Sequence, residues 1–112
     1  MKRYYGVRLP KGDDRIEKFK LQRKRRGFDD SETWNLDVTI AEFILPRLKV
    51  FKELNIAYPP SLTPEKWDEI IDTMIYSFEE IIKNDWSLDE EVNRKIKLGL
   101  DNFREYYFNL WW

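Results

Sequence analysis

Two charged side chains interrupt the apolar faces of a helix that the sequence predicts between residues 31 and 55. At about 100° per residue, Asp37 and Arg47 each lie among large apolar side chains of this helix. A buried charge without a partner is costly, so each needs an ion pair or a wetted pocket. Two interpretations stay open: these residues form structural pairs or cap backbone groups freed by Pro46, or they line a ligand pocket with Trp34.

The pocket interpretation suits a nucleotide ligand, because the sequence offers a side chain for each of its parts. An aromatic ring would stack on the base, guanidinium groups would meet phosphate, and a carboxylate would accept hydrogen bonds from the ribose or the base. The expected ligand-binding residues are Trp34, Asp37, Arg47, Arg3, Tyr5 and Arg8. We expect neither a cofactor nor a metal in this site.

A basic run stands directly before Gly27 and consists of Arg23, Lys24, Arg25 and Arg26. Clustered Lys and Arg side chains release counterions from phosphates, so the run suggests contact with nucleic acid. The alternative is docking within the chain, onto an acidic helix that follows. Nucleic-acid binding is therefore the second hypothesis for this protein.

The residues needed for most catalytic sites are missing. Four carboxylates fall on two turns of a predicted helix, at Glu65, Asp68, Glu69 and Asp72, a spacing that could hold a hard cation. A solvated acidic face is favoured, because no Glu-x-x-His pair accompanies them. The chain has no His and no Cys, which excludes histidine bases, thiolate zinc sites and cysteine nucleophiles. We expect a protein that is not an enzyme.

Composition indicates a single water-soluble domain. The chain has 112 residues, and 16% of them are aromatic, so ring burial should supply much of the stability. No apolar run approaches the ~20 residues of a membrane span, and no signal peptide is recognisable. These features predict an intracellular protein.

Charge is distributed unevenly and defines a basic N-terminal arm, residues 1–30, ahead of a helical bundle, residues 31–112. Residues 1–26 hold eleven Lys or Arg against three acidic residues. The start of the arm is predicted to be extended, and Arg15 to Arg26 to form a short helix with Ile16 and Phe19 on one side, stopped by Gly27.

The expected fold is all-α, a compact bundle of three main helices at about 31–55, 64–84 and 88–111. Asp30 or Ser31 would cap the first helix, which is apolar on more than one side and should be enclosed by the others. Pro46 should bend or break it. Thr63 and Pro64 begin the second helix, whose apolar residues between Trp67 and Ile82 follow a spacing of three and four.

The last helix and its aromatic end suggest self-association. Ser87 and Glu90 are predicted to form a capping box, and the apolar stripe of this helix includes Phe103 and Tyr107. Surplus rings at the C-terminus should be covered by the arm, by a second subunit or by a partner. We therefore expect a homodimer, with an interface at Tyr4, Tyr106, Phe108 and Trp112.

Three segments carry a resemblance to a known family. The segments are Gly27–Asp37, which contains Trp-Asn-Leu-Asp, Ile40–Leu48, which contains Pro-Arg-Leu, and Leu62–Asp72. The similarity extends to two shorter stretches, Gly99-Leu100-Asp101 and the ending Leu110-Trp111-Trp112. Over residues 27–112 the chain resembles small, mostly uncharacterised helical proteins encoded by bacteriophages and prophages. The resemblance implies a phage protein in the cytoplasm of a bacterial host and supplies no catalytic residues. By association with this setting, we expect it to neutralise a host defence protein or a nucleotide immune signal.

Overall fold

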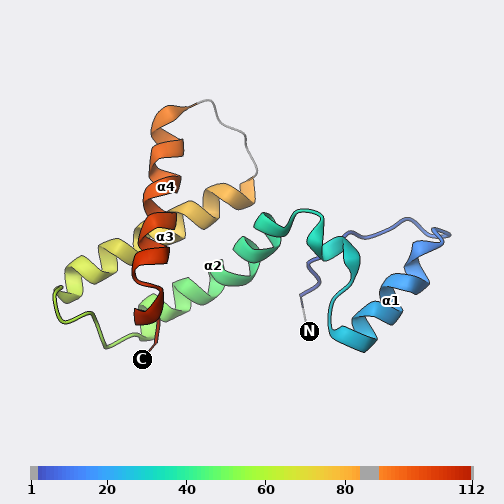
Figure 1. The fold of residues 1–112 in the computed structure, drawn as a ribbon, viewed down its shortest axis with the longest axis horizontal. Coiled ribbons are helices and arrows are strands. Elements are labelled where there is room, and N and C mark those ends of the chain that lie inside the picture. The colour runs from blue at the N-terminus through green and yellow to red at the C-terminus, as the bar shows by residue number, and fades with distance from the viewer. Residues whose placement is uncertain (1–2, 84–88, 112) are drawn as a thin grey trace. The chain divides into compact units, whose positions relative to one another are not determined.

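The computed structural model describes residues 3–83 and 89–111, and in these residues the protein is all-helical, as predicted (Figure 1). It contains α1 (Arg15–Arg26), α2 (Leu36–Leu54), α3 (Pro64–Lys83) and α4 (Glu90–Glu105), with short 3₁₀ helices η1 (Asp30–Thr33) and η2 (Tyr107–Asn109). The described residues therefore form four α-helices, one more than the predicted three main helices. The chain divides into two compact units, residues 1–40 and 41–112.

The N-terminal unit extends past the predicted arm, which ended at residue 30, and is organised around α1. This helix confirms the short basic helix expected at Arg15–Arg26. Gly27 ends it with φ 88°, and its N–H donates to the Arg23 carbonyl. Phe19 is buried and Ile16 half-buried, as their spacing predicted.

The cap between α1 and α2 differs from the prediction. Asp29, rather than Asp30 or Ser31, caps the helical turn that follows: its carboxylate accepts from the Ser31 N–H, and Glu32 accepts from the Asp29 N–H in a capping box. The turn is a 3₁₀ helix, so the first main helix begins only at Leu36. Three adjacent residues could each cap a helix, and local sequence does not distinguish them.

The prediction that this helix is enclosed on several sides was wrong. α2 fully buries Ala41 and Leu48 and partly buries three more apolar residues against the core, Ile44, Leu45 and Phe51. Its exposed apolar residues, Leu36, Ile40, Phe43, Val50 and Leu54, are about half exposed. α2 also runs through Pro46 without a break. The close helix pair of the C-terminal unit is α3 with α4, so α2 is covered along one face only.

A glycine allows α4 to lie close against α3, which it crosses in Figure 1. Gly99 is buried, and a Cβ at this position would lie 1.9 Å from Ser77 Oγ and 2.1 Å from the Thr73 carbonyl oxygen. Ser77 donates to the Ile96 carbonyl over 2.7 Å, and Asn102 donates to the Thr73 hydroxyl over 2.9 Å. A larger residue than glycine would force the two helices apart.

The apolar stripe predicted for α3 is confirmed and forms most of the core. The buried core residues are Ala41, Leu48, Trp67, Ile70, Ile71, Met74 and Phe78. At the start of α3, the Lys66 N–H donates to the Thr63 hydroxyl, as the predicted cap requires. No helix in the described part of the chain is long and apolar enough to cross a membrane.

Both ends of the last helix differ from the prediction. Asp89 caps α4 by accepting from the Glu91 and Val92 N–H groups, while Ser87 lies outside the described residues. The helix ends at Glu105, and the tighter turn of η2 follows. With about three residues per turn, Tyr106 rather than Tyr107 follows Phe103 onto the core, and Tyr107 is exposed.

Candidate ligand-binding surface of the N-terminal unit

A fully buried carboxylate holds the N-terminal unit together. Asp29 accepts hydrogen bonds from the Tyr4 hydroxyl over 2.6 Å and from the Ser31 hydroxyl over 2.5 Å, and it forms an ion pair with Arg23. We call Tyr4, Arg23, Asp29 and Ser31 the Asp29 cluster. Burial raises the pKa of Asp29, but the hydrogen bonds from Ser31, Tyr4 and Arg23 lower it by more, so the pKa lies below its usual value. The carboxylate is therefore ionised at neutral pH.

The Asp29 cluster fixes the path of the segment before α1. The Val7 N–H donates to the Ser31 hydroxyl over 2.9 Å, next to the bond between Tyr4 and Asp29. Gly6 lies so close to these groups that a Cβ there would come within 2.5 Å of the Ser31 hydroxyl oxygen. This segment forms no strand, and its contacts hold it on its own unit.

Beside this segment lies a hollow of about 160 Å³, which we call the N-terminal hollow. Its lining residues are Tyr4, Val7, Arg8, Leu9, Ile16, Phe19 and Arg23. The floor is apolar, and Arg8 is exposed at its wall without an ion pair to any described residue. A ring could lie in this hollow while an anionic group meets the guanidinium of Arg8.

Guanidinium groups also lie over aromatic rings elsewhere in this unit. Arg15 lies 5.8 Å from the centroid of the Trp34 ring, and Arg3 lies 5.5 Å from that of Tyr5. The Arg15 guanidinium is held by Asp13, and its hydrogen bonds lower the pKa of that carboxyl to about 2. Such pairs present charge and a flat apolar surface together.

Each of the three residues predicted to line a pocket, Trp34, Asp37 and Arg47, is exposed. Trp34 is half exposed and packs edge-on against Phe19, and Asp37 is exposed in the first turn of α2. Arg47 stands ten positions after Asp37, about 15 Å along α2 at 1.5 Å per residue. It is exposed, lies 3.8 Å from the centroid of the Phe43 ring and donates to the Phe43 carbonyl over 2.8 Å. The ring beneath Arg47 explains how a charge is accommodated on an apolar stripe.

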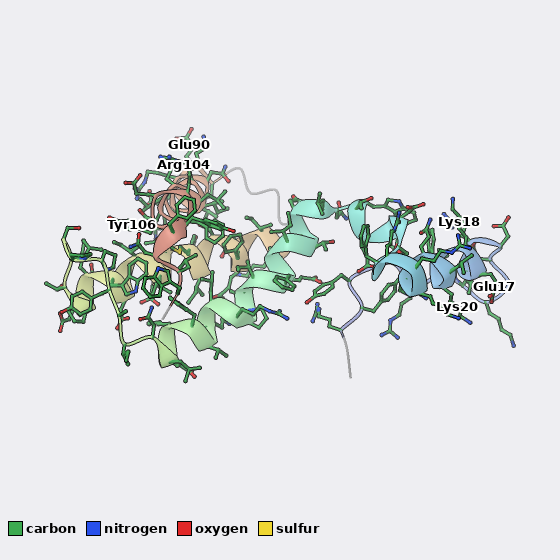
Figure 2. The ribbon with its side chains drawn as sticks, turned by 60° about the horizontal axis from the view of Figure 1, so that its bottom comes forward. Glu17, Lys18, Lys20, Glu90, Arg104 and Tyr106 are labelled. Atoms are coloured by element: carbon green, nitrogen blue, oxygen red, sulfur yellow. The ribbon has the colours of Figure 1, made fainter. Side chains whose placement is uncertain are left out.

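The basic run is divided between structural and exposed members. Arg23 pairs with Asp29, and Arg26 pairs with Asp30 over 2.7 Å, so both bind carboxylates that follow α1 directly. Lys24 and Arg25 are exposed and make no ion pair with a described residue. Earlier on α1, Lys18 and Lys20 also carry largely exposed side chains (Figure 2).

The predicted interface residues lie in different environments. Tyr4 belongs to the Asp29 cluster, and Tyr106 packs edge-on against Trp67 with 5.6 Å between ring centroids (Figure 2 labels Tyr106). Phe108 is 87% exposed, and Trp112 lies outside the described residues. Of the three predicted interface residues that the structure describes, Tyr4, Tyr106 and Phe108, only Phe108 presents an exposed ring.

The carboxylates of α3 stand apart from any metal-binding arrangement. Asp72 pairs with Lys52 over 2.7 Å, and Glu69 pairs with Lys66 over 3.3 Å. Among residues 3–83 and 89–111, no three acidic, His or Cys side chains come together to hold an ion.

A second hollow, of about 290 Å³, lies between α3 and α4 and is lined by residues including Tyr76, Lys95 and Leu98.

Sequence reasoning missed the Asp29 cluster and did not place Arg8 beside an apolar hollow. The spacing of Ile16 and Phe19 was the available signal for its floor, and Arg8 was chosen for its charge alone. Comparison of the chain with protein-family models, curated proteins and solved structures gave no match.

Proposed function

We propose that this protein is a non-enzymatic phage accessory protein that binds and neutralises a component of the bacterial host, in the form of a nucleotide immune signal. The N-terminal hollow is the observation that supports this proposal, because an apolar floor lies next to an exposed guanidinium group. The family resemblance supplies the phage setting, and the bacterial cytoplasm is the expected location.

The size of the hollow suggests how a nucleotide would sit. Pockets that enclose a whole drug-sized ligand measure roughly 300–1,000 Å³. At about 160 Å³, the N-terminal hollow holds one ring, with the phosphates outside it. The base would lie against Phe19 and Leu9, and Arg8 would contact a phosphate. Arg3 and Tyr5, on the same segment, are the next residues expected to contribute.

Calorimetry of the full chain against linear and cyclic nucleotides tests this assignment. Arg8→Gln should weaken binding at least tenfold, because it removes one charge-assisted contact. Lys11→Gln is the matched control: Lys11 is an exposed cation of the same segment that does not line the hollow. Absence of heat with every nucleotide, or equal losses in both variants, would remove the nucleotide assignment. Co-purification of a defined defence protein would then favour inhibition of that protein.

Nucleic-acid binding is the second candidate, favoured by the exposure of Lys24 and Arg25. Each phosphate contact contributes about 0.9 to the slope of log affinity against log salt. A Lys24→Gln/Arg25→Gln variant should therefore bind DNA or RNA more weakly, with a slope smaller by about 2. Unchanged affinity and slope in this variant would reject the basic run as a nucleic-acid site.

A further inference from the structure

α2 carries a second apolar face besides the one that covers the core. Its residues are Leu36, Ile40, Phe43, Arg47, Val50 and Leu54, which we call the α2 stripe. The apolar members are each between 47% and 51% exposed. Five large apolar side chains on one helix, all about half exposed, form a surface that gains from being covered.

The spacing along the α2 stripe is that of a two-helix seam. Successive members are separated by four, three, four, three and four residues, the alternation of a and d positions in a heptad repeat. At about 100° per residue, they fall within roughly 80° around the helix. The buried residues Ala41 and Leu48 lie roughly 130° away from the centre of the stripe. α2 can therefore pack against the core with one face and pair with another helix through the other face at the same time.

The order of side chains shows which helix fits. The stripe is symmetric about residue 45: Leu36 matches Leu54, Ile40 matches Val50, and Phe43 matches Arg47. We propose that α2 pairs antiparallel with α2 of a second copy of this chain, related by a two-fold axis near residue 45. The leucines then meet each other, Ile40 meets Val50, and Phe43 meets Arg47, which is the self-complementarity that a two-fold interface requires.

Arg47 fits this arrangement better than it fits an unrelated apolar partner. In one chain its guanidinium already lies over the Phe43 ring. In the antiparallel pair, Arg47 of each chain also faces Phe43 of the other, so a cation lies against aromatic surface on both sides. A polar residue at one a position sets the register of a helix pair at a cost in stability.

The length of the seam predicts a weak dimer. α2 has 19 residues, or about 28 Å of helix at 1.5 Å per residue, and the contact is one helix wide. Stable complexes typically bury about 800 Å² per partner, which a single short seam does not reach. We therefore expect a dissociation constant in the micromolar range.

Sedimentation equilibrium of the full chain from a few to a few hundred micromolar tests the pairing surface. Val50→Glu should raise the dissociation constant at least tenfold, whereas Arg47→Leu should lower it by a similar factor. Leu100→Glu, at an exposed position on α4, is the control and should leave the dimer intact. Phe108→Glu tests the aromatic C-terminus as the alternative interface. A monomeric mass over the whole range, or dissociation by Phe108→Glu with Val50→Glu unaffected, would overturn the proposal.

The absence of cysteine from the sequence allows the register to be tested directly. Equimolar Ile40→Cys and Val50→Cys proteins, mixed and oxidised, should form the mixed disulfide, because these positions oppose each other in the antiparallel pair. Val50→Cys alone should not crosslink, since its two copies lie about 15 Å apart along the seam, beyond the Cα separation of a disulfide. Efficient crosslinking of Val50→Cys alone would indicate a parallel pair and contradict the two-fold arrangement.

Discussion

Replacing Asp29 with alanine removes the group that joins α1, η1 and the segment before α1. Breaking a buried ion pair costs about 3–5 kcal/mol, and losing a helix cap costs about 0.5–2 kcal/mol. The side chain of Arg23 is 35% exposed, so solvent compensates part of the first loss. We therefore expect the N-terminal unit of Asp29→Ala to be less stable by about 2–4 kcal/mol.

Amide hydrogen exchange of α1 measures this loss locally, without relying on the stability of the other unit. A tenfold change in an equilibrium corresponds to about 1.4 kcal/mol, so α1 amides should exchange roughly 30- to 1,000-fold faster. Asp30→Ala is the matched control, because it removes the neighbouring carboxylate from exposed pairs with Arg26 and Lys18. Exposed pairs contribute about 0.2–1 kcal/mol each, so losing both should change exchange by about 30-fold at most, below nearly all of the range expected for Asp29→Ala.

Comparing amide exchange in Asp29→Ala and Asp30→Ala separates the effect of the buried Asp29 cluster from that of an exposed ion pair. Equal exchange rates in Asp29→Ala and Asp30→Ala would show that burial of the Asp29 cluster contributes nothing beyond a surface ion pair. A large change in Asp29→Ala confined to η1, with α1 unaffected, would likewise refute the claim that Asp29 joins these segments. Tyr4→Phe should lie between the variants, because it removes one hydrogen bond and leaves the ion pair in place.

Three further predictions concern pH and the helices. Folding lowers the pKa of Asp29, so the stabilisation that its carboxylate provides is complete above the unfolded pKa of about 3.9. This stabilisation is lost as the pH falls through the folded-state pKa, and amide exchange of α1 should report the loss. Asp29→Asn should show no such pH dependence. Gly99→Ala should lower the free energy of unfolding by about 1–3 kcal/mol in chemical denaturation, because its Cβ overlaps α3; an unchanged value would contradict the close packing. Pro46→Ala should raise the melting temperature measured by circular dichroism, because it restores a backbone donor at an exposed helical position. Proline costs up to about 3 kcal/mol relative to alanine inside a helix. A lower melting temperature would show that the proline ring stabilises α2.

Elements defined by neighbouring residues were predictable from the sequence. Thr63 and Pro64 marked the start of α3, and Gly27 marked the end of α1, because caps and helix stops act over a few residues. The apolar spacing from Trp67 to Ile82 predicted the core face of α3, since helical period and burial are linked directly. The all-helical fold class follows from the same local signals.

Features that depend on distant residues were not predictable in this way. The bond between Tyr4 and Asp29 joins positions 25 residues apart, and nothing in either local sequence pairs them. Because the Tyr4 hydroxyl binds Asp29, this residue rather than Asp30 or Ser31 serves as the cap. Tyr4 also lines the N-terminal hollow.

The sequence by itself determined which segments are helical and that α2 has more apolar surface than one neighbour can cover. Only the tertiary structure decided which of its faces meets the core: Ala41 and Leu48 are buried in one cluster with residues of α3, while α4 packs against α3 through Gly99. Helical periodicity follows from backbone geometry at each residue, whereas the choice of partner depends on side chains that fit together across the fold.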